Sequence, residues 1–72
     1  MKKITYITVY INGKPFNCHL SMTIKDFLLY LNFDLDLIVI EYNYQVMDIS
    51  QYDNTILKMN DSIEVITIVG GG

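Results

Sequence analysis

One short amphipathic helix is the feature that most limits how this chain can fold. Its apolar side chains recur at a spacing of three or four residues, and they are Ile24, Phe27, Leu28 and Leu31. This spacing places them on one face of a helix. A helix of about nine residues is too short to be stable by itself in water. We therefore expect it to pack its apolar face across a β-sheet. Ser21 or Thr23 can cap its first turn, and Asn32 is its expected end.

Strand patterns occupy most of the remaining sequence, because β-branched and aromatic side chains dominate there. The predicted strands are residues 5–11, 15–20, 37–42, 45–47 and 62–69. Asn12-Gly13 predicts a type I′ turn between the first two strands, since both central residues of that turn need a positive φ. The apolar run 37–42 predicts a central strand that is buried on both faces.

The order of these elements predicts the fold class. A helix packed on one face of a mixed sheet is a two-layer α+β domain, and short connections place the last strand beside the first. We therefore expect the β-grasp, or ubiquitin-like, fold, in which one main helix covers a mixed sheet of four to five strands. The 72 residues are enough for one domain. Residues 1–69 are the expected domain, and the three glycines 70–72 are an expected flexible tail.

Charge and composition exclude several kinds of partner. The net charge is −3, and the five lysines are scattered along the chain, whereas a nucleic-acid binder needs clustered positive charge. No apolar run approaches the ~18 residues that span a membrane. The single cysteine cannot form an internal disulfide, which suits a reducing compartment. We expect no nucleic-acid or membrane partner, and a location in a bacterial cytoplasm or the plastid stroma.

The reactive side chains do not assemble into a catalytic or metal site. Strand alternation directs Cys18 toward the core and His19 toward the opposite face, so the two cannot act as a pair. A covalent link from Cys18 to a partner is the minor alternative. The chain has one histidine, whereas a zinc site needs three or four ligands. We expect a protein that is not an enzyme and that binds no metal and no cofactor of its own.

An exposed patch is expected on the sheet face that the helix leaves open. Tyr6 and Tyr10 share one face of the first predicted strand, and Ile66 and Ile68 share one face of the last. Tyrosine is common at interfaces because it offers a large contact area at low entropic cost. Our hypothesis is that these four side chains bind a partner protein. The alternative is that the tyrosines only cover the sheet.

Three segments resemble the ThiS family of sulfur carriers of thiamine thiazole synthesis. They are TIKDFLLYL at 23–31, IVIEYN at 38–43 and NDSIEVITIVGGG at 60–72. The family usually carries an aspartate before its last strand, here Asp61, and a Gly-Gly end. Asn60 stands where members often have glycine, and asparagine also tolerates a left-handed backbone. The resemblance covers nearly the whole chain and implies the same β-grasp fold.

The resemblance also implies a chemistry for the carboxyl end. A carboxylate is ionised at pH 7 and is a poor electrophile, so a ThiF-type adenylating enzyme would activate Gly72 with ATP. A sulfur donor such as a cysteine desulfurase would then supply the sulfur of a terminal thiocarboxylate. A thiazole synthase of the ThiG type would receive that sulfur. Gly70 and Gly71 have no Cβ, so their backbone can thread a narrow channel. The partner-binding patch would dock the activating enzyme.

Two other functions stay open at this point. A MoaD-type carrier for molybdopterin synthesis would use the same fold and a similar Gly-Gly end with another acceptor. A ubiquitin-like modifier would form amide bonds to lysines, and a plain interaction module would leave the tail unused. Weighing the chain after incubation with an activating enzyme separates a carrier from a modifier. Growth of a thiamine-requiring strain separates the two carriers.

Overall fold

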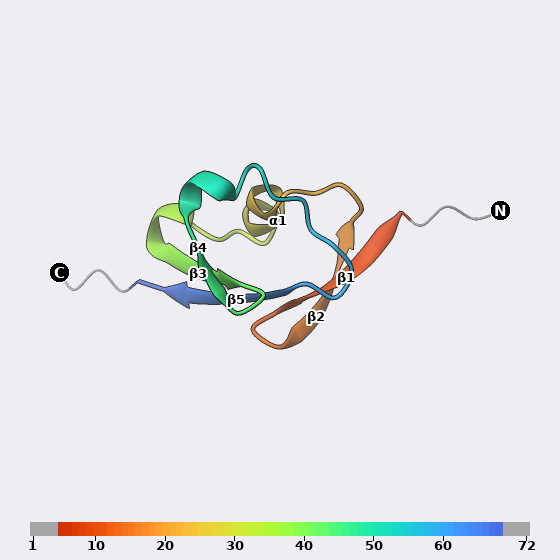
Figure 1. The fold of residues 1–72 in the computed structure, drawn as a ribbon, viewed down its shortest axis with the longest axis horizontal. Coiled ribbons are helices and arrows are strands. Elements are labelled where there is room, and N and C mark those ends of the chain that lie inside the picture. Colours follow the sequence, from red (N-terminus) through yellow and green to blue (C-terminus); the bar gives the residue numbers. More distant parts are fainter. Residues whose placement is uncertain (1–4, 69–72) are drawn as a thin grey trace.

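The computed structural model describes residues 5–68, and residues 1–4 and 69–72 lie outside that description. Within it, five strands, one α-helix and two short 3₁₀ helices follow one another (Figure 1). In chain order they are β1 (Tyr6–Ile11), β2 (Lys14–His19), α1 (Ile24–Tyr30), η1 (Leu35–Leu37), β3 (Ile38–Tyr42), β4 (Gln45–Met47), η2 (Ile49–Gln51) and β5 (Ser62–Thr67). The five strands and the helix that the sequence predicts are confirmed, with ends that differ by one or two residues, and Val69 of the last predicted strand lies outside the described residues. The sequence patterns do not predict η1 and η2.

The strands form one mixed sheet with β5 at its centre. The order is β2-β1-β5-β3-β4. β1 and β5 run parallel, with Tyr10 opposite Ser62 and Ile11 opposite Ile63. The other neighbouring strands are antiparallel. The predicted pairing of the last strand with the first is therefore confirmed, and the architecture is the predicted β-grasp.

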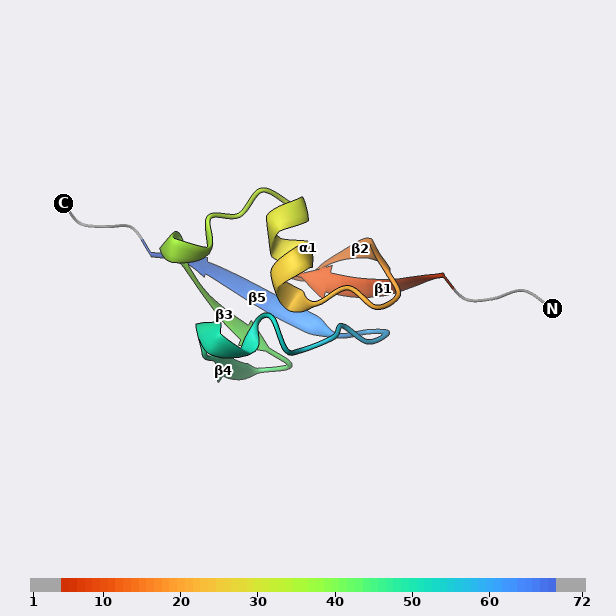
Figure 2. The same ribbon diagram turned by 90° about the horizontal axis from the view of Figure 1, so that it is seen from above.

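Helix α1 covers one face of the sheet and leaves the other face open. Figure 1 shows α1 on one side of the strands, and Figure 2 shows it lying over the middle of the sheet. The predicted side chains Ile24, Phe27 and Leu28 are buried beneath it. The rest of the buried apolar core comes from the strands and from the β4–β5 connection, and consists of Ile7, Val9, Ile11, Cys18, Ile38, Ile40, Tyr52, Leu57 and Ile63.

Local side-chain signals fix both ends of α1. The Thr23 hydroxyl oxygen accepts a hydrogen bond from the Asp26 N–H at 3.1 Å, so Thr23 rather than Ser21 is the N-cap. The charge of Asp26 lies in the first turn, where the helix dipole favours an anion. After the helix, Asn32 has a φ of 66°, a left-handed conformation that asparagine tolerates. The helix has only 7 residues, so packing on the sheet supplies most of its stability.

The predicted hairpin turn is present and also holds β5. Asn12 and Gly13 have φ values of 51° and 81°, as a type I′ turn requires. The Asn12 side-chain oxygen accepts a hydrogen bond from the Val65 N–H at 2.7 Å. The Asn12 backbone N–H donates to the Ile63 carbonyl at 2.9 Å. The turn that reverses β1 therefore also anchors the central strand.

The prediction that residues 37–42 form a central strand buried on both faces is wrong. β3 lies between β5 and β4, and only its alternate residues Ile38 and Ile40 are buried. Val39 and Glu41 are half-buried on the other face, because α1 covers one side of the sheet only. The consequence is that part of an apolar run is available on the open face.

Candidate functional site

β5 carries the chain from the middle of the sheet to one end of the molecule. Ile63, near its beginning, is fully buried and pairs with Ile11 on one side and Tyr42 on the other. Beyond the strand, the Ile68 N–H donates to the Leu37 carbonyl at 2.6 Å. The chain is thus held up to the last described residue. Figure 1 shows that β5 ends on the side opposite the beginning of β1.

The predicted site residues Gly70, Gly71 and Gly72 follow Ile68 in the sequence and lie outside the described residues. The division into a domain of residues 1–69 and a tail of residues 70–72 therefore stays a prediction. The structure does show the strand that precedes these residues, and β5 has hydrogen-bonded neighbours on both of its edges.

A buried carboxylate fixes the beginning of β5. Asp61 is 6% exposed, and its Oδ2 accepts hydrogen bonds from the Tyr42 hydroxyl at 2.5 Å and the Lys58 backbone N–H at 2.8 Å. Its Oδ1 accepts from the Asn43 side-chain amide at 3.2 Å. Hydrogen bonds to an ionised acceptor are stronger than those between neutral groups. Asp61 thus joins the turn before β5 to the end of β3.

Replacing Tyr42 by Phe should change how stability depends on pH. Burial, followed by the hydrogen bond to Asp61, raises the pKa of Tyr42 from 10.0 to about 12. The folded state therefore favours the neutral phenol, and its stabilising contribution is complete below about pH 10. That contribution is lost as the pH rises through 12. We expect Tyr42→Phe to be less stable than the unsubstituted protein at pH 8, and the difference to shrink between pH 10 and 12.

Urea unfolding at a series of pH values measures this difference. The control is Tyr44→Phe, because Tyr44 is 80% exposed and adjoins the same turn. A stability difference for Tyr42→Phe that stays constant up to pH 12 would contradict the assignment of the phenol to the Asp61 network.

The four residues predicted to bind a partner share the open sheet face but are spread along its length. Tyr10 lies opposite Ser62 in the parallel pair. Tyr6 lies four residues before Tyr10 on β1, and Ile68 lies six residues after Ser62 in the opposite direction along the sheet. At a rise of ~3.3 Å per residue, Tyr6 and Ile68 lie roughly 30 Å apart along the sheet. The structure therefore spreads Tyr6, Tyr10, Ile66 and Ile68 along one face rather than clustering them, because sequence alternation gives the face but not the position along it. Their role in binding a partner stays a prediction.

Ile66 and Ile68 have other apolar neighbours on the open face. Val39 pairs directly with Ile66, and Val46, which pairs with Glu41, is 71% exposed. Together these residues are named the β3–β5 patch, which consists of Val39, Val46, Ile66 and Ile68. The sequence interpretation missed the two valines because it treated β3 as buried on both faces. The three-residue strand β4 is too short for its alternation to show a face.

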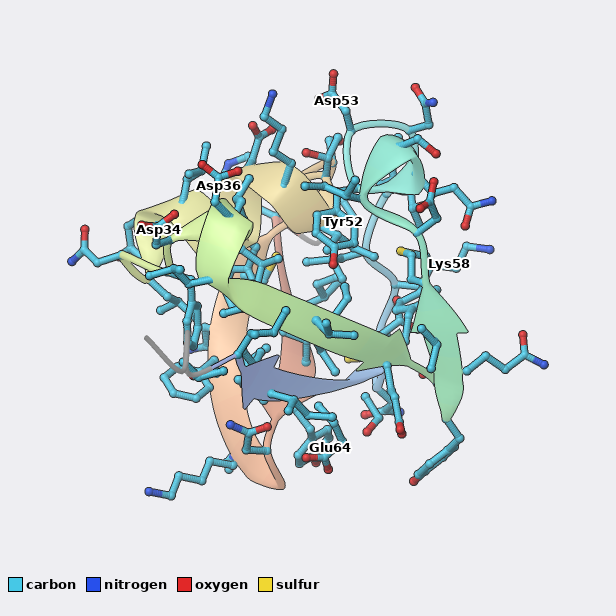
Figure 3. All side chains as sticks on the ribbon, turned by 90° about the vertical axis from the view of Figure 1, so that its left-hand side faces the viewer. Asp34, Asp36, Tyr52, Asp53, Lys58 and Glu64 are labelled. Atoms are coloured by element: carbon cyan, nitrogen blue, oxygen red, sulfur yellow. The ribbon has the colours of Figure 1, made fainter. Side chains whose placement is uncertain are left out.

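Two carboxylates lie opposite each other beside the β3–β5 patch. Glu41 of β3 pairs directly with Glu64 of β5, and Figure 3 shows Glu64 on the side of β5 that faces away from the helix. Like charges that face each other on neighbouring strands are unfavourable. Their presence gives the patch a negative margin, which suits a partner surface with an apolar centre and a basic edge.

Cys18 and His19 lie where the sequence predicts them. Cys18 is 2% exposed, and burial raises the pKa of its thiol. His19 is exposed on the open face, where its ring meets Tyr6 edge-on with a centroid distance of 5.4 Å. Among residues 5–68, no group of three or more His, Cys, Asp or Glu side chains could hold a metal ion. The same part of the chain contains no helix with the length and apolar character to cross a bilayer.

The fold and the placement of β5 define a class of protein. A single helix over a mixed sheet, with the last strand at its centre and a glycine sequence after that strand, is the arrangement of small ubiquitin-like carrier proteins. The ThiS family model matches residues 9–72. The chain therefore belongs to the ThiS family, whose members are small sulfur carriers rather than enzymes.

Comparison with individual proteins finds similar sequences and a similar fold. The chain is 39% identical over 66 residues to the protein ycf40 of Porphyra purpurea, which covers 92% of this chain and 93% of that protein. It is 31% identical over 64 residues to a thiazole synthase of Magnetococcus marinus, which covers 89% of this chain and 20% of that protein. The crystal structure of the thiamine biosynthesis protein ThiS from Geobacter metallireducens superimposes with a TM-score of 0.79 at 26% identity, and the match covers 92% of this chain and all of that one.

Proposed function

We propose that this protein carries sulfur, as a thiocarboxylate on the carboxyl group of Gly72, to the enzyme that builds the thiazole moiety of thiamine. Membership of the ThiS family supports a sulfur carrier. The thiamine branch rather than the molybdopterin branch is favoured by the similar Geobacter protein, which is described as a thiamine biosynthesis protein. The similarity to a segment of a thiazole synthase points the same way.

The chemistry requires an external source of energy. The ionised carboxylate of Gly72 attacks the α-phosphorus of ATP in a ThiF-type adenylating enzyme, and pyrophosphate leaves. The acyl-adenylate is a mixed anhydride, so the terminal sulfur of a persulfide on a donor such as a cysteine desulfurase can displace AMP and form an acyl disulfide. A thiol then attacks the donor sulfur of this disulfide, which breaks the S–S bond and leaves the thiocarboxylate on Gly72. The carrier itself binds no cofactor in this scheme, because ATP belongs to the partner. Its own task is to bring a carbonyl carbon without a bulky side chain into two different active sites.

The placement of β5 is the observation that carries this proposal. The strand is paired on both sides, and the Ile68 N–H is still bonded to Leu37 at 2.6 Å. Extended backbone covers at most ~3.3–3.6 Å per residue, so three residues such as 70–72 can span no more than roughly 10 Å. Glycine accepts backbone conformations that other residues refuse. A firmly held strand followed by such a tail suits delivery of the carboxyl carbon into a narrow channel.

A thiazole synthase is the proposed acceptor. In the Magnetococcus thiazole synthase, the segment similar to this chain makes up 20% of the protein. Covalent linkage of two binding modules raises the effective concentration of each for the other, which suits a carrier segment that serves the enzyme joined to it. The ycf40 relatives are plastid-encoded, so the plastid stroma is the favoured location of the two expected from composition.

Intact-mass measurement tests the proposed function. The purified protein is incubated with a ThiF-type enzyme, ATP, a sulfur donor and a thiol reductant, and a second sample omits ATP. We expect the mass to increase by the difference between a sulfur and an oxygen atom, in the sample with ATP only. Covalent addition to lysines of other proteins would instead identify a ubiquitin-like modifier. An unchanged mass with an active enzyme would contradict the carrier assignment.

We also propose the β3–β5 patch as the surface that docks the adenylating enzyme. It lies on the same strand that leads to the tail, and Glu41 and Glu64 supply negative charge beside it. Charge of one sign on a binding surface raises the rate of encounter with a partner of the opposite sign. Tyr6 lies at the far end of the sheet and is not part of this surface.

Replacing Ile66 by Asp should weaken binding of the adenylating enzyme without unfolding the domain. Ile66 is 51% exposed, so the substitution adds a charge to a surface that must become dry on docking. We expect an affinity loss of about tenfold or more, which corresponds to ~1.4 kcal/mol. The matched control is Leu29→Asp, because Leu29 is 49% exposed on α1. Titration calorimetry measures the affinity of both variants for the adenylating enzyme. Equal affinities would show that the β3–β5 patch does not dock this enzyme.

A further inference from the structure

A groove opens between η1 and η2, at the end of the sheet where β5 ends. Two adjoining hollows of about 550 Å³ and 300 Å³ share Leu35, Asp36, Ile49 and Tyr52 as lining residues. We call this feature the η1–η2 groove. Figure 3 shows Tyr52 in the space between the two 3₁₀ segments, with Asp36 on the side of η1 and Asp53 near η2.

The floor of the η1–η2 groove is apolar. Ile38 and Tyr52, which are 7% and 3% exposed, form its base. Val46 and Ile49 stand at its margin and are 71% and 53% exposed. Exposed apolar surface that lines a hollow is typical of a binding site rather than of ordinary protein surface.

The rim of the groove is strongly acidic. Asp36, Asp48 and Asp53 line it, and Lys25 is the lysine among its lining residues. Asp48 is the N-cap of η2, and the hydrogen bonds from the Ser50 hydroxyl and N–H lower the pKa of its carboxyl group. This carboxylate is therefore ionised throughout the neutral pH range.

A second capping aspartate lies next to the groove at η1. The Asp34 side chain accepts a hydrogen bond from the Asp36 N–H at 3.0 Å, so η1 and its charges are held in place. Both 3₁₀ helices therefore begin at an aspartate. The negative charges stand on fixed turns on either side of the apolar floor.

We propose that the η1–η2 groove docks a cationic, amphipathic segment of a partner protein. Apolar side chains of that segment would lie on Leu35 and Ile49, which line both hollows above the buried Ile38 and Tyr52. Its lysines or arginines would meet Asp36 and Asp53. Phosphate-rich partners, whether nucleic acid or phospholipid, are repelled by the acidic rim. A second copy of this chain carries a net charge of −3 and is repelled as well.

The position of the groove adds a functional reason for this occupant. The Ile68 N–H bonds to the Leu37 carbonyl of η1, so the exit of β5 adjoins the groove. A partner that holds the groove is within reach of the residues after Ile68. The groove meets the β3–β5 patch at Val39 and Val46, and binding there does not depend on the chemistry at Gly72.

Two synthetic amphipathic peptides with identical leucine positions test the proposal. One carries lysine at its polar positions and the other carries glutamate. Each is titrated into the ¹⁵N-labelled full chain, and amide shifts are followed by NMR. We expect the lysine peptide to shift amides in residues 35–38 and 48–53 and to bind at least about tenfold more tightly than the glutamate peptide. Its affinity should fall as salt is added.

Two double variants with the same change in net charge complete the experiment. Asp36→Asn with Asp53→Asn removes two charges from the groove, and Glu41→Gln with Glu64→Gln removes two from the open sheet face. We expect the first pair to lower the affinity for the lysine peptide about tenfold and the second to leave it nearly unchanged. The proposal is overturned by equal losses in the two pairs, by equal binding of both peptides, by shifts confined to the open face, or by no shift at all.

Discussion

A chain that lacks Gly72 should fold normally and yet fail to acquire sulfur. Its carboxyl group would lie on Gly71, short of its place in the adenylating site by about the 3.3–3.6 Å that one extended residue spans. Misplacement of a reacting atom by even 1 Å can cost about 100-fold in rate. We therefore expect formation of the thiocarboxylate to fall by at least about 100-fold, measured by intact mass against time.

The variant Gly72→Ala separates two properties of the last residue, which are the distance of its carboxyl group from β5 and the conformational freedom of its backbone. It keeps the carboxyl group at the same distance from β5 and adds a single Cβ. We expect slower conversion than for the unsubstituted chain and faster conversion than for the deletion. Thermal unfolding of both variants should match the unsubstituted protein, because the core that the structure describes is built from residues 7–65 and is unchanged in both. Conversion of the deletion variant at the full rate would show that the sulfur is not carried on Gly72.

Replacing the buried Asp61 by Ala should produce a larger loss of stability than replacing any exposed aspartate of the turns. The substitution removes the acceptor for the Tyr42 hydroxyl, the Asn43 amide and the Lys58 N–H together. Each buried donor left without a partner costs ~1–3 kcal/mol. Water can reach part of this site after the change, so we expect a total loss of about 3 kcal/mol. For a domain of this size that lowers the melting temperature by roughly 10–20 °C.

Asp53→Ala is the control for this substitution. Asp53 is exposed, and surface changes of this kind usually stay within about 0.5 kcal/mol. Tyr42→Phe removes one of the three hydrogen bonds and should fall between the two, at about 1 kcal/mol. Chemical denaturation of all three variants measures the order. Equal stability of Asp61→Ala and Asp53→Ala would show that the network contributes nothing to the fold.

Most of the fold follows from local signals in the sequence. The helical spacing of Ile24, Phe27 and Leu28 gives the buried face of α1, and Asn12-Gly13 gives the hairpin because both residues accept a positive φ. Pairing of the last strand with the first follows from short connections. The helix and the hairpin are each determined within a few residues, so pattern and turn chemistry are sufficient to predict them. The pairing of β5 with β1 joins distant residues and follows from a rule of topology instead.

The site depends on relations that local patterns do not contain. Alternation places Tyr6 and Ile66 on one sheet face, but only the register of β1 against β5 shows that they are far apart. Val39 joins the patch because a single helix leaves one face of β3 open. The Asp61 network joins residues 19 positions apart. The η1–η2 groove needs two 3₁₀ turns whose capping aspartates resemble ordinary loop residues.

The central position of β5 has a consequence for synthesis on the ribosome. Residues 5–47 contain β1 and β3, but neither can complete its pairing until residues 62–67 have emerged. An interrupted translation product would expose two unpaired strand edges, which are prone to aggregation. Such a fragment would be a substrate for proteases rather than a competitor for the partner enzymes. The sheet of this protein can therefore be completed only after nearly all of the chain has been synthesised.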